Sequence, residues 1–540
     1  MSGNDDLEAP GRGIRQSMSD LHTWAGLLLG WVLYAMFLTG TVAYFKDELS
    51  QWMRPELSHQ AQVPDQAAVA QRVANELGNV AVGASQWTIR LTDARNNSVY
   101  AYWFNRGAGG RGFGDGYFDS ATGQKVTSRE TLGGEFFLRF HFQFHYMPAF
   151  WGRWLAGIAA MFMLVAIISG VITHKKIFVD FFTFRWGKGQ RSWLDAHNAL
   201  SVFGLPFHAM ITYTGLVTLM AMYMPWGERA AIKAPAERQQ LSAELSAVLP
   251  SGRPSGQAVP LASIDAMVRQ AQERWGRDNV GRIHISQPGD ATARVAVSRG
   301  EPGRVSMSPQ FMEFEGTTGK LVRVRDNFGP AAETRGVLYA LHLGRFSDIT
   351  TRWLYFLVSF MGTAMVGTGL VMWTVKRRQK LKDPARPYFG FRLVERMNVA
   401  SIAGLSIAMT AFLWANRLLP HGVKGRADWE IHIFFIVWGV ALLHALVRPV
   451  RSAWIEQLWA AAAMLFLLPV LNAVSTQRPF WRSLMEGDWI FAGMDIMCWV
   501  LALLHATLAI RAARKGIVSQ PKLRPSRSAS TTVASGEGVA

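Results

Sequence analysis

Histidine side chains flank the apolar segments of this chain. His141 and His145 precede one such segment, His174 follows it, and His197 begins the next. Neutral imidazole is a common ligand of iron and other transition metals. Ligands at both ends of a membrane-spanning segment predict cofactors stacked across a bilayer, and therefore electrons that move between two compartments.

Three further histidines extend this pattern. His22 opens the first apolar segment, His208 lies eleven residues beyond His197, and His342 precedes a later apolar segment. A single histidine near a membrane interface is more often a hydrogen-bonding residue. Ionisable groups within membrane segments are costly, however, and indicate function when they recur. The candidate ligands are His22, His141, His145, His174, His197, His208 and His342.

These residues fit the ligation of haem by histidines from different helices, without covalent attachment. From His145 to His174 is roughly 43 Å of helix, which one haem cannot bridge. We therefore expect two or more b-type haems. The expected iron ligands are His145 and His342 towards the outer face, and His174 and His197 towards the inner face. His22 competes for an inner position, and His208 lies at intermediate depth.

Composition narrows the class of protein. The chain has 540 residues, of which 50% are hydrophobic, and a single cysteine, Cys498. Recurrent apolar runs of bilayer length are typical of an integral membrane protein. One cysteine excludes disulfides within the chain and iron–sulfur clusters held by several thiolates. The net charge of +18 comes largely from short loops between apolar runs, so we expect positive-inside bias and no nucleic acid partner.

The apolar runs predict about eight transmembrane helices. They cover approximately residues 21–45, 154–173, 196–226, 353–375, 397–416, 431–447, 458–474 and 489–510. Basic loops at 175–191, 376–396, 448–451 and 511–515 alternate along this topology. They predict a multi-pass membrane protein with both termini in the cytoplasm.

Two polar regions, 47–140 and 227–335, then lie outside. Each is expected to contain a helix, at about 66–77 and 261–275, followed by strands at 85–90, 98–104 and 116–118, and at 283–285, 293–298 and 304–306. The Gly-rich stretch 106–116 is typical of a loose loop. The match of FDSATGQKV (118–126) to FEGTTGKLV (314–322) indicates an internal repeat. Chance similarity of two β-turns is the alternative.

The segment after residue 396 carries fewer candidates. Asp495 and His505 lie in the last apolar run. They fit a proton path or a quinone site, or equally two packed polar residues that pair with neighbours. No phosphate-binding loop or dinucleotide fingerprint is present, so we expect electrons from a separate protein, a cofactor at the inner face, or membrane quinol.

The histidine motifs resemble the PepSY-associated transmembrane family, also called iron-regulated membrane proteins. The matching pieces are Leu21-His22-Thr23-Trp24-Ala25-Gly26, Leu38-Thr39-Gly40, His141-Phe142-Gln143-Phe144-His145, Gly170-Val171-Ile172-Thr173-His174-Lys175-Lys176, Asp195-Ala196-His197-Asn198, Pro206-Phe207-His208 and Leu341-His342-Leu343-Gly344. The resemblance covers about residues 15–380. It implies an α-helical integral membrane protein with about eight spans and two periplasmic α+β PepSY-like domains.

The resemblance further implies an oxidoreductase of ferric siderophores that lies in the bacterial inner membrane and uses b-type haem. Under this interpretation, residues 1–20 are a cytoplasmic segment, 21–46 the first span, 141–226 a histidine-rich hairpin, 336–376 the fourth span, 377–396 a cytoplasmic loop, 397–511 a four-span extension and 512–540 a cytoplasmic tail. The expected partners are a ferric siderophore, an electron donor and membrane lipid. The alternatives are a non-enzymatic regulator that binds a peptide or protease, and a transporter of iron or siderophore.

Overall fold

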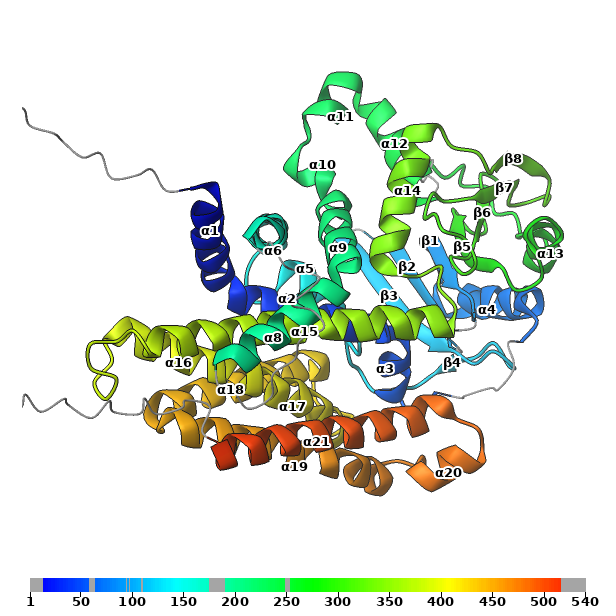
Figure 1. Ribbon diagram of the computed structural model, residues 1–540. Helices are drawn as coiled ribbons and strands as arrows, with labels where there is room; N and C mark the ends of the chain where they lie inside the picture. The colour runs from blue at the N-terminus through cyan, green and yellow to red at the C-terminus, as the bar shows by residue number, and fades with distance from the viewer. Residues whose placement is uncertain are drawn as a thin grey trace, which may run out of the picture.

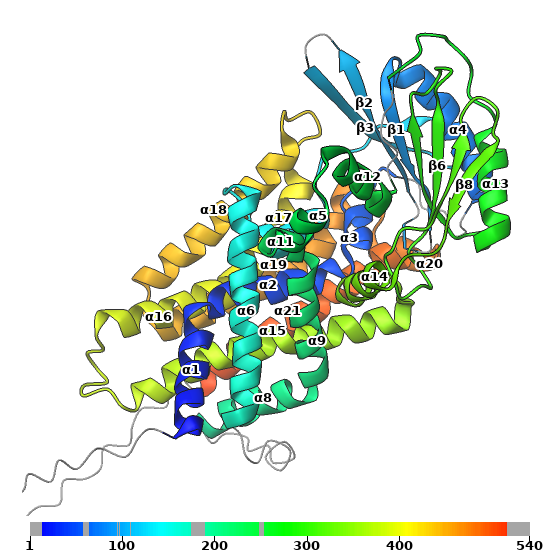
Figure 2. The ribbon, with the colours of Figure 1, turned by 90° about the horizontal axis from the view of Figure 1, so that it is seen from above.

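The computed structural model describes residues 13–57, 64–93, 95–96, 98–107, 110–173, 190–247 and 253–515. The predicted ligand His174 lies outside these residues, as does most of the basic loop that follows it. Long helices make up one side of the molecule, and a single β-sheet lies at the other end (Figures 1 and 2). We call these two ends the basic side, where the loop after residue 378 lies, and the sheet side.

The described residues up to Arg378 form two copies of one arrangement. The first copy contains α1 (Ile14–Leu28), α2 (Gly30–Ala43), α3 (Lys46–Trp52), α4 (Gln66–Val80), β1 (Ala84–Arg90), β2 (Val99–Gly107), β3 (Gly110–Phe118), β4 (Lys125–Val126), α5 (Glu135–Gln143) and α6 (Ala149–Thr173). The second contains α8 (Gln190–Phe203), α9 (Leu205–Thr218), α10 (Met220–Tyr223), α11 (Trp226–Ala231), α12 (Pro235–Ser246), α13 (Ile264–Trp275), β5 (Val280–Ser286), β6 (Arg294–Arg299), β7 (Phe311–Glu315), β8 (Leu321–Arg325), α14 (Pro330–Leu343) and α15 (Ile349–Arg378).

A sharp bend occurs at the same place in both copies. α1 and α2 meet at 66°, and α8 and α9 meet at 68°. The non-helical residues at these breaks are Leu29 and Gly204, which are 175 positions apart. The second break falls within the span predicted over 196–226. It lies just before Pro206, which is in the first turn of α9, where its missing N–H costs no hydrogen bond.

Within the described residues, six uninterrupted helices are long and apolar enough to cross a membrane, and each bent pair adds one more if it forms a single span. The structure thus contains six to eight candidate spans, and the exact number of eight stays a prediction. The C-terminal helices are α16 (Phe389–Val399), the π-helical turn η1 (Ala400–Gly404), α17 (Leu405–Leu418), α18 (Arg426–Val447), α19 (Val450–Ser475), α20 (Phe480–Met485) and α21 (Trp489–Lys515). α16, η1 and α17 form one continuous span.

Both polar regions contribute strands to one sheet of eight strands, in the order β4-β3-β2-β1-β5-β6-β7-β8. The two halves join where β1 pairs antiparallel with β5, with Trp87 opposite Ile285. The sequence indicated two α+β domains. In the structure the strands of both regions form one sheet instead, because β1 and β5 hydrogen-bond each other along edges that would otherwise be unpaired.

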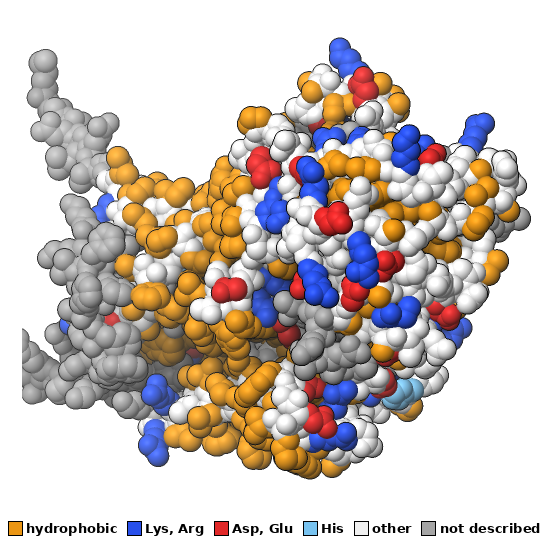
Figure 3. All heavy atoms as spheres, turned by 90° about the vertical axis from the view of Figure 1, so that its right-hand side faces the viewer, with side chains coloured by type: hydrophobic (Ala, Val, Ile, Leu, Met, Phe, Trp, Pro, Cys, Tyr) orange, Lys and Arg blue, Asp and Glu red, His pale blue; other side chains and the backbone are white. Residues whose placement is uncertain are grey.

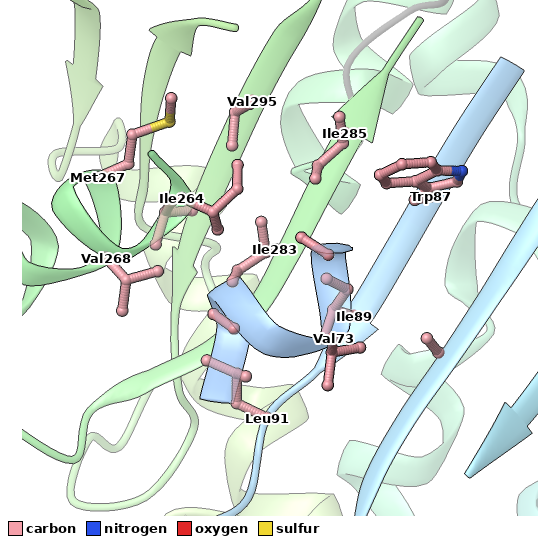
Figure 4. Packing of buried hydrophobic residues seen from close by; sticks show 14 of the residues in the cluster. Val73, Trp87, Ile89, Leu91, Ile264, Met267, Val268, Ile283, Ile285 and Val295 are labelled. Carbon is pink, nitrogen blue, oxygen red and sulfur yellow. The ribbon is translucent and has the colours of Figure 1, made fainter. Parts of the chain in front are cut away.

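Two helices cover the same face of this sheet. In Figure 4, Val73 of α4 and Ile264 of α13 point towards Ile89 and Ile283 of the joined strands. Each helix begins with a polar residue whose side chain accepts a hydrogen bond from the first turn, Asp65 for α4 and Ser263 for α13. The core of the sheet therefore lies across the boundary between the two copies.

The matching turns predicted by sequence are confirmed. In the first copy, Gly123 N donates to Asp119 O at 2.8 Å, and in the second, Gly319 N donates to Glu315 O at 2.9 Å. Both glycines have a positive φ, 78° and 73°, a conformation that favours glycine. The repeated Thr-Gly pair therefore marks an equivalent hairpin in each half of the sheet.

Two strand predictions were wrong. Most of the Gly-rich stretch 106–116 belongs to β3 rather than to a loop, because its glycines make room for larger residues of β2. A Cβ on Gly114 would lie 2.4 Å from the Trp103 ring. Residues 304–306 form no strand, because the strand that pairs with β6 is β7, at Phe311–Glu315.

The C-terminal helices pack against the first copy. Phe136 of α5 lies 4.9 Å from Phe412 of α17 and 5.2 Å from Phe434 of α18, between ring centroids. Arg417 of α17 stacks over the Trp52 ring and donates to the Trp52 carbonyl at 2.6 Å. The C-terminal helices therefore contact the first copy at two places, at α5 within the apolar layer and at Trp52 of α3.

The surface divides in the same way as the fold. In Figure 3, hydrophobic side chains cover most of the left half, where the long helices lie, and charged side chains gather over the right half, which carries the sheet. This distribution is that of a multi-pass membrane protein with one polar end.

Candidate functional site

The first histidine pair lies towards the sheet side. His141 of α5 and His342 of α14 face each other, with ring centroids 6.2 Å apart and an interplanar angle of 31°. His141 Nδ1 hydrogen-bonds the Met36 carbonyl at 2.7 Å, and His342 Nδ1 hydrogen-bonds the Ile211 carbonyl at 3.0 Å. The two rings come from different copies, and each is held by a helix of its own copy.

The second pair lies towards the basic side. His22 of α1 and His197 of α8 have ring centroids that are also 6.2 Å apart, with an interplanar angle of 73°. His22 Nδ1 bonds the Ala166 carbonyl of α6 at 2.8 Å, and His197 Nδ1 bonds the Met365 carbonyl of α15 at 2.9 Å. The arrangement of the first pair is thus repeated at another depth.

These hydrogen bonds fix the chemistry of all four rings. A carbonyl oxygen can only accept, so Nδ1 of each ring must carry the proton. In a neutral imidazole the lone pair then resides on Nε2, which is the atom available to a metal. Histidine ligands in metalloproteins are oriented by this same kind of bond at the other ring nitrogen.

A glycine lies beside each ring, four residues after the bonded carbonyl. These glycines are Gly40, Gly215, Gly170 and Gly369. A Cβ would approach the ring to 2.7 Å at Gly40, 2.8 Å at Gly215 and 3.2 Å at each of the other two. Because a helical Cβ points towards the N-terminus, a side chain there would cover the carbonyl one turn earlier. Glycine therefore keeps the carbonyl's second lone pair open to the histidine.

Burial keeps the sheet-side pair neutral. α5 and α14 are short helices outside the candidate spans, and burial lowers the pKa of both His141 and His342. For His342, burial and the neighbouring His141 together bring the pKa to about 3. Both rings are therefore uncharged at neutral pH, which is the protonation state that ligates metals.

The spacing within each pair fits axial ligation of one metal atom. A metal–nitrogen bond of about 2 Å on each side, with roughly 1 Å more from each nitrogen to its ring centre, separates the ring centres by about 6 Å. In the described part of the chain, no group of three or more His, Cys, Asp and Glu side chains could hold a metal ion. Haem needs only two axial ligands, because its other four come from the macrocycle. The residues therefore fit haem.

The structure changes the expected pairing on the sheet side. The sequence placed His145 opposite His342, but His141 occupies that position. α5 ends at Gln143, and Phe144 adopts a left-handed φ of 57°, so His145 leaves the helix face of His141. Its ring instead stacks on Phe435 at 5.7 Å between centroids.

On the basic side, His22 is the partner of His197. His174, the other residue expected there, lies outside the described residues. The role of His174 as a ligand stays a prediction.

His208 is a buried histidine outside both pairs. Its Nε2 lies 3.3 Å from the Val358 carbonyl, and its Nδ1 has no hydrogen-bond partner in the described part of the chain. On α15, Val358 precedes Met365 by seven residues, about 10 Å of helix. On α9, Ile211 follows His208 by three. His208 therefore lies between the two pairs, as the sequence predicted.

The two polar residues of the last span differ in their surroundings. Asp495 is fully buried, and neither carboxylate oxygen has a hydrogen-bond partner among the described residues. His505 Nδ1 bonds the Leu501 carbonyl of its own helix at 2.8 Å, and its ring lines an elongated groove. The structure does not join them into one site.

Sequence reasoning missed the carbonyl and glycine that support each ring. Their signal was present, since Met36 and Ile211, and likewise Gly40 and Gly215, are each 175 positions apart. The glycines were noted as residues that let helices approach closely. Alignment of the two copies would have shown that each accompanies one histidine.

Comparisons with known proteins agree with this architecture. Residues 19–376 match the family model described as PepSY-associated TM region. A protein of Pseudomonas aeruginosa with the name Uncharacterized protein PA4219 is 24% identical over 380 residues, which cover 67% of this chain and 92% of that protein. The family match spans both copies of the repeat and ends before α16.

Proposed function

The chain belongs to the PepSY-associated transmembrane family, and from this premise we propose that it is a haem-containing reductase of the bacterial inner membrane. It passes electrons across the bilayer to a ferric siderophore and releases Fe(II). The observation that carries the proposal is the matched arrangement of His22 with His197 and of His141 with His342. Two such pairs at different depths are what transfer across a membrane requires.

Each pair would hold one b-type haem through Nε2 of its two rings. When bound, haem supplies one-electron chemistry through its iron. The surrounding chain keeps each ring oriented through a backbone carbonyl, as Met36 does for His141. It also excludes water, because the supporting carbonyls lie on helices packed within the apolar layer. Rigid ligands change little between two oxidation states, which favours rapid electron transfer.

The direction of transfer follows from the two ends of the molecule. We propose that the basic side faces the cytoplasm, since Lys376, Arg377 and Arg378 end the last span of the repeat there. The sheet then lies in the periplasm, where the ferric siderophore is the electron acceptor. Siderophore oxygen donors are hard and favour Fe(III), so reduction to the softer Fe(II) weakens the chelate and releases iron.

The test is an anaerobic visible spectrum of the purified protein before and after addition of a ferric siderophore. We expect two haems per chain and a reduced α-band that disappears when the chelate is added, with Fe(II) trapped by a chromogenic chelator. The same siderophore loaded with redox-inert gallium(III) is the matched control and should leave the band unchanged.

Two outcomes would contradict the proposal. Correctly folded protein that contains no haem would leave a regulator or binding protein as the better interpretation, and such a protein should stay active after His197→Ala. Siderophore flux into vesicles without a change in iron oxidation state would indicate a transporter.

A further inference from the structure

A long apolar groove runs between the two copies of the repeat and the C-terminal helices. Its volume is about 1810 Å³, its walls are α15 and α21, and residues of α2 and α17 also line it. Its lining extends along α15 from Ile349 to Val375. That length is about 39 Å of helix, which exceeds the roughly 30 Å thickness of the hydrocarbon core. The groove is therefore long enough to cross both leaflets.

The basic-side end of the groove lies directly behind the inner histidine pair. Ala196 of α8 and Thr368 of α15 both line it. Each is the chain neighbour of a residue that builds the pair, His197 and Gly369 respectively. A molecule in this end of the groove is thus separated from the His22–His197 site by one helix surface.

The same end carries a titratable side chain. His505 of α21 lines the groove, and because its Nδ1 donates to the Leu501 carbonyl, Nε2 carries the lone pair. Trp193 of α8 packs against the cluster that includes Val375 and Ala509, so α8, α15 and α21 converge here. A histidine on a membrane helix is costly unless it has a polar partner or a function.

We propose that this groove binds a membrane quinol, which is the electron donor to the inner histidine pair. The inference rests on the proposed function and adds the class of its donor. The quinol ring lies at the basic-side end beside His505 and Thr368, and the isoprenoid tail lies along the apolar groove. A phospholipid is the poorer fit, because its acyl chains cover only one leaflet, about half of the hydrocarbon core.

The reaction balances with the proposed reductase. Quinol loses the hydrogens of its two hydroxyl groups and becomes quinone, with the release of two protons and two electrons. His505 Nε2 accepts one proton and water at the basic-side mouth accepts the other. The electrons leave singly by way of the inner pair, so one quinol reduces two Fe(III) ions of the siderophore to Fe(II).

The test fills the groove with a single side chain. Gly493 of α21 lines the groove, and a Cβ there would meet no atom within 4 Å. Gly493→Trp should therefore place an indole ring in the groove. Gly439→Trp on α18 is the matched control, since Gly439 also has nothing within 4 Å and does not line the groove.

Two quantities are measured on the purified full-length chain. The first is quinone extracted per chain, quantified by chromatography. The second is the anaerobic rate at which decylubiquinol reduces the haem. We expect about one quinone per chain in the wild type and in Gly439→Trp. Gly493→Trp should lose at least tenfold in both quantities, while dithionite reduction and reoxidation by the ferric siderophore stay unchanged.

His505→Ala tests the contact of the ring. This variant should retain its quinone and reduce haem at least tenfold more slowly with quinol. Wild-type protein that carries phospholipid but no quinone would overturn the inference, as would Gly493→Trp that keeps its quinol-dependent rate. Protein that lacks haem but contains quinone would refute the proposed reductase alone, because quinone content is measured without haem.

Discussion

The two copies of the repeat have the same residues at the two histidine pairs, where the copies contact each other. They differ at the position of His208, which lies between the pairs. Each copy supplies one ring to each histidine pair. The same copy supplies the carbonyl that holds this ring and the glycine beside it. The difference lies at His208, whose counterpart 175 positions earlier is Leu33. Gly362, against which the His208 ring packs, likewise corresponds to Met163, 199 positions earlier.

This difference separates two kinds of requirement. A site on the boundary between copies needs the same residue from both, so the four paired rings could not diverge without loss of a ligand. Position 208 lies within one copy. In the first copy the equivalent Leu33 and Met163 belong to one apolar cluster, which shows that the fold itself needs no histidine there.

The largest effect should follow from removal of a paired ring. His22→Ala or His197→Ala should each lower the haem content from two per chain to one, and so should His141→Ala or His342→Ala. The loss is the same for both members of a pair, because one axial ligand holds haem far more weakly than two. Haem per chain is measured by the pyridine haemochrome assay, with the exposed His421→Ala as control. A loss confined to one copy would contradict the shared site.

Exchange of the unmatched residues should have a smaller effect on stability. Leu33→His should destabilise the protein by about 1–3 kcal/mol, because it buries a polar ring among apolar neighbours. His208→Leu should cost less than about 1 kcal/mol, since it removes a ring with one unpartnered nitrogen. The midpoint of thermal unfolding measures both. Loss of haem in His208→Leu would show that this residue is itself a ligand.

A charged contact between the copies should make stability depend on pH. Burial alone would raise the pKa of Asp47, but Arg345 of the second copy and Lys46 outweigh it and lower the pKa to about 2. A carboxylate with a depressed pKa stabilises the folded state above its unfolded pKa, near 4. That contribution, roughly 2 kcal/mol, should be lost as the pH falls from about 4 to 2.

The measurement compares the wild type with Asp47→Asn. The difference in unfolding midpoint between them should be largest above pH 4 and should vanish towards pH 2. A difference that is constant across this range would mean that the carboxylate is not involved.

The smallest effect should follow from substitution of the glycines beside the rings, and it should differ between the sheet-side pair and the basic-side pair. Gly40→Ala and Gly215→Ala place a methyl group within 2.8 Å of a ring, whereas Gly170→Ala and Gly369→Ala leave 3.2 Å. We expect the first two to cost about 1 kcal/mol more than the second two, because the sheet-side rings must move further. Unfolding midpoints and electron paramagnetic resonance of the haems report this, with Gly26→Ala as the control. Equal effects at both depths would contradict it.

The sequence predicted those features that depend on local pattern. Apolar runs located the spans, and the repeated Thr-Gly turns identified the internal repeat. The candidate ligands included all four paired rings. Charge on the loops predicted an orientation, which stays a prediction.

Features that depend on long-range packing were not predictable in this way. The choice of His141 over His145 is decided by Phe144. Its positive φ ends α5 two residues before His145, so the two rings do not share a helix face. The strand β3 was not predicted, because its glycines are required by a contact with Trp103 on the neighbouring strand β2. The union of two domains into one sheet depends on the pairing of β1 with β5. These strands are far apart in the chain, and no local sequence pattern predicts that they pair.

That union has a consequence for how the chain folds. Trp87 and Ile285 pair across 198 positions, so the edge of β1 that pairs with β5 stays open until β5 has been synthesised. Contacts of such long sequence separation form slowly, and an unpaired strand edge invites aggregation in the meantime. We therefore expect closure of the sheet to be a late step of folding, after the helices have assembled. Substitutions at the β1–β5 seam should therefore lower the yield of folded protein more than they alter either histidine pair.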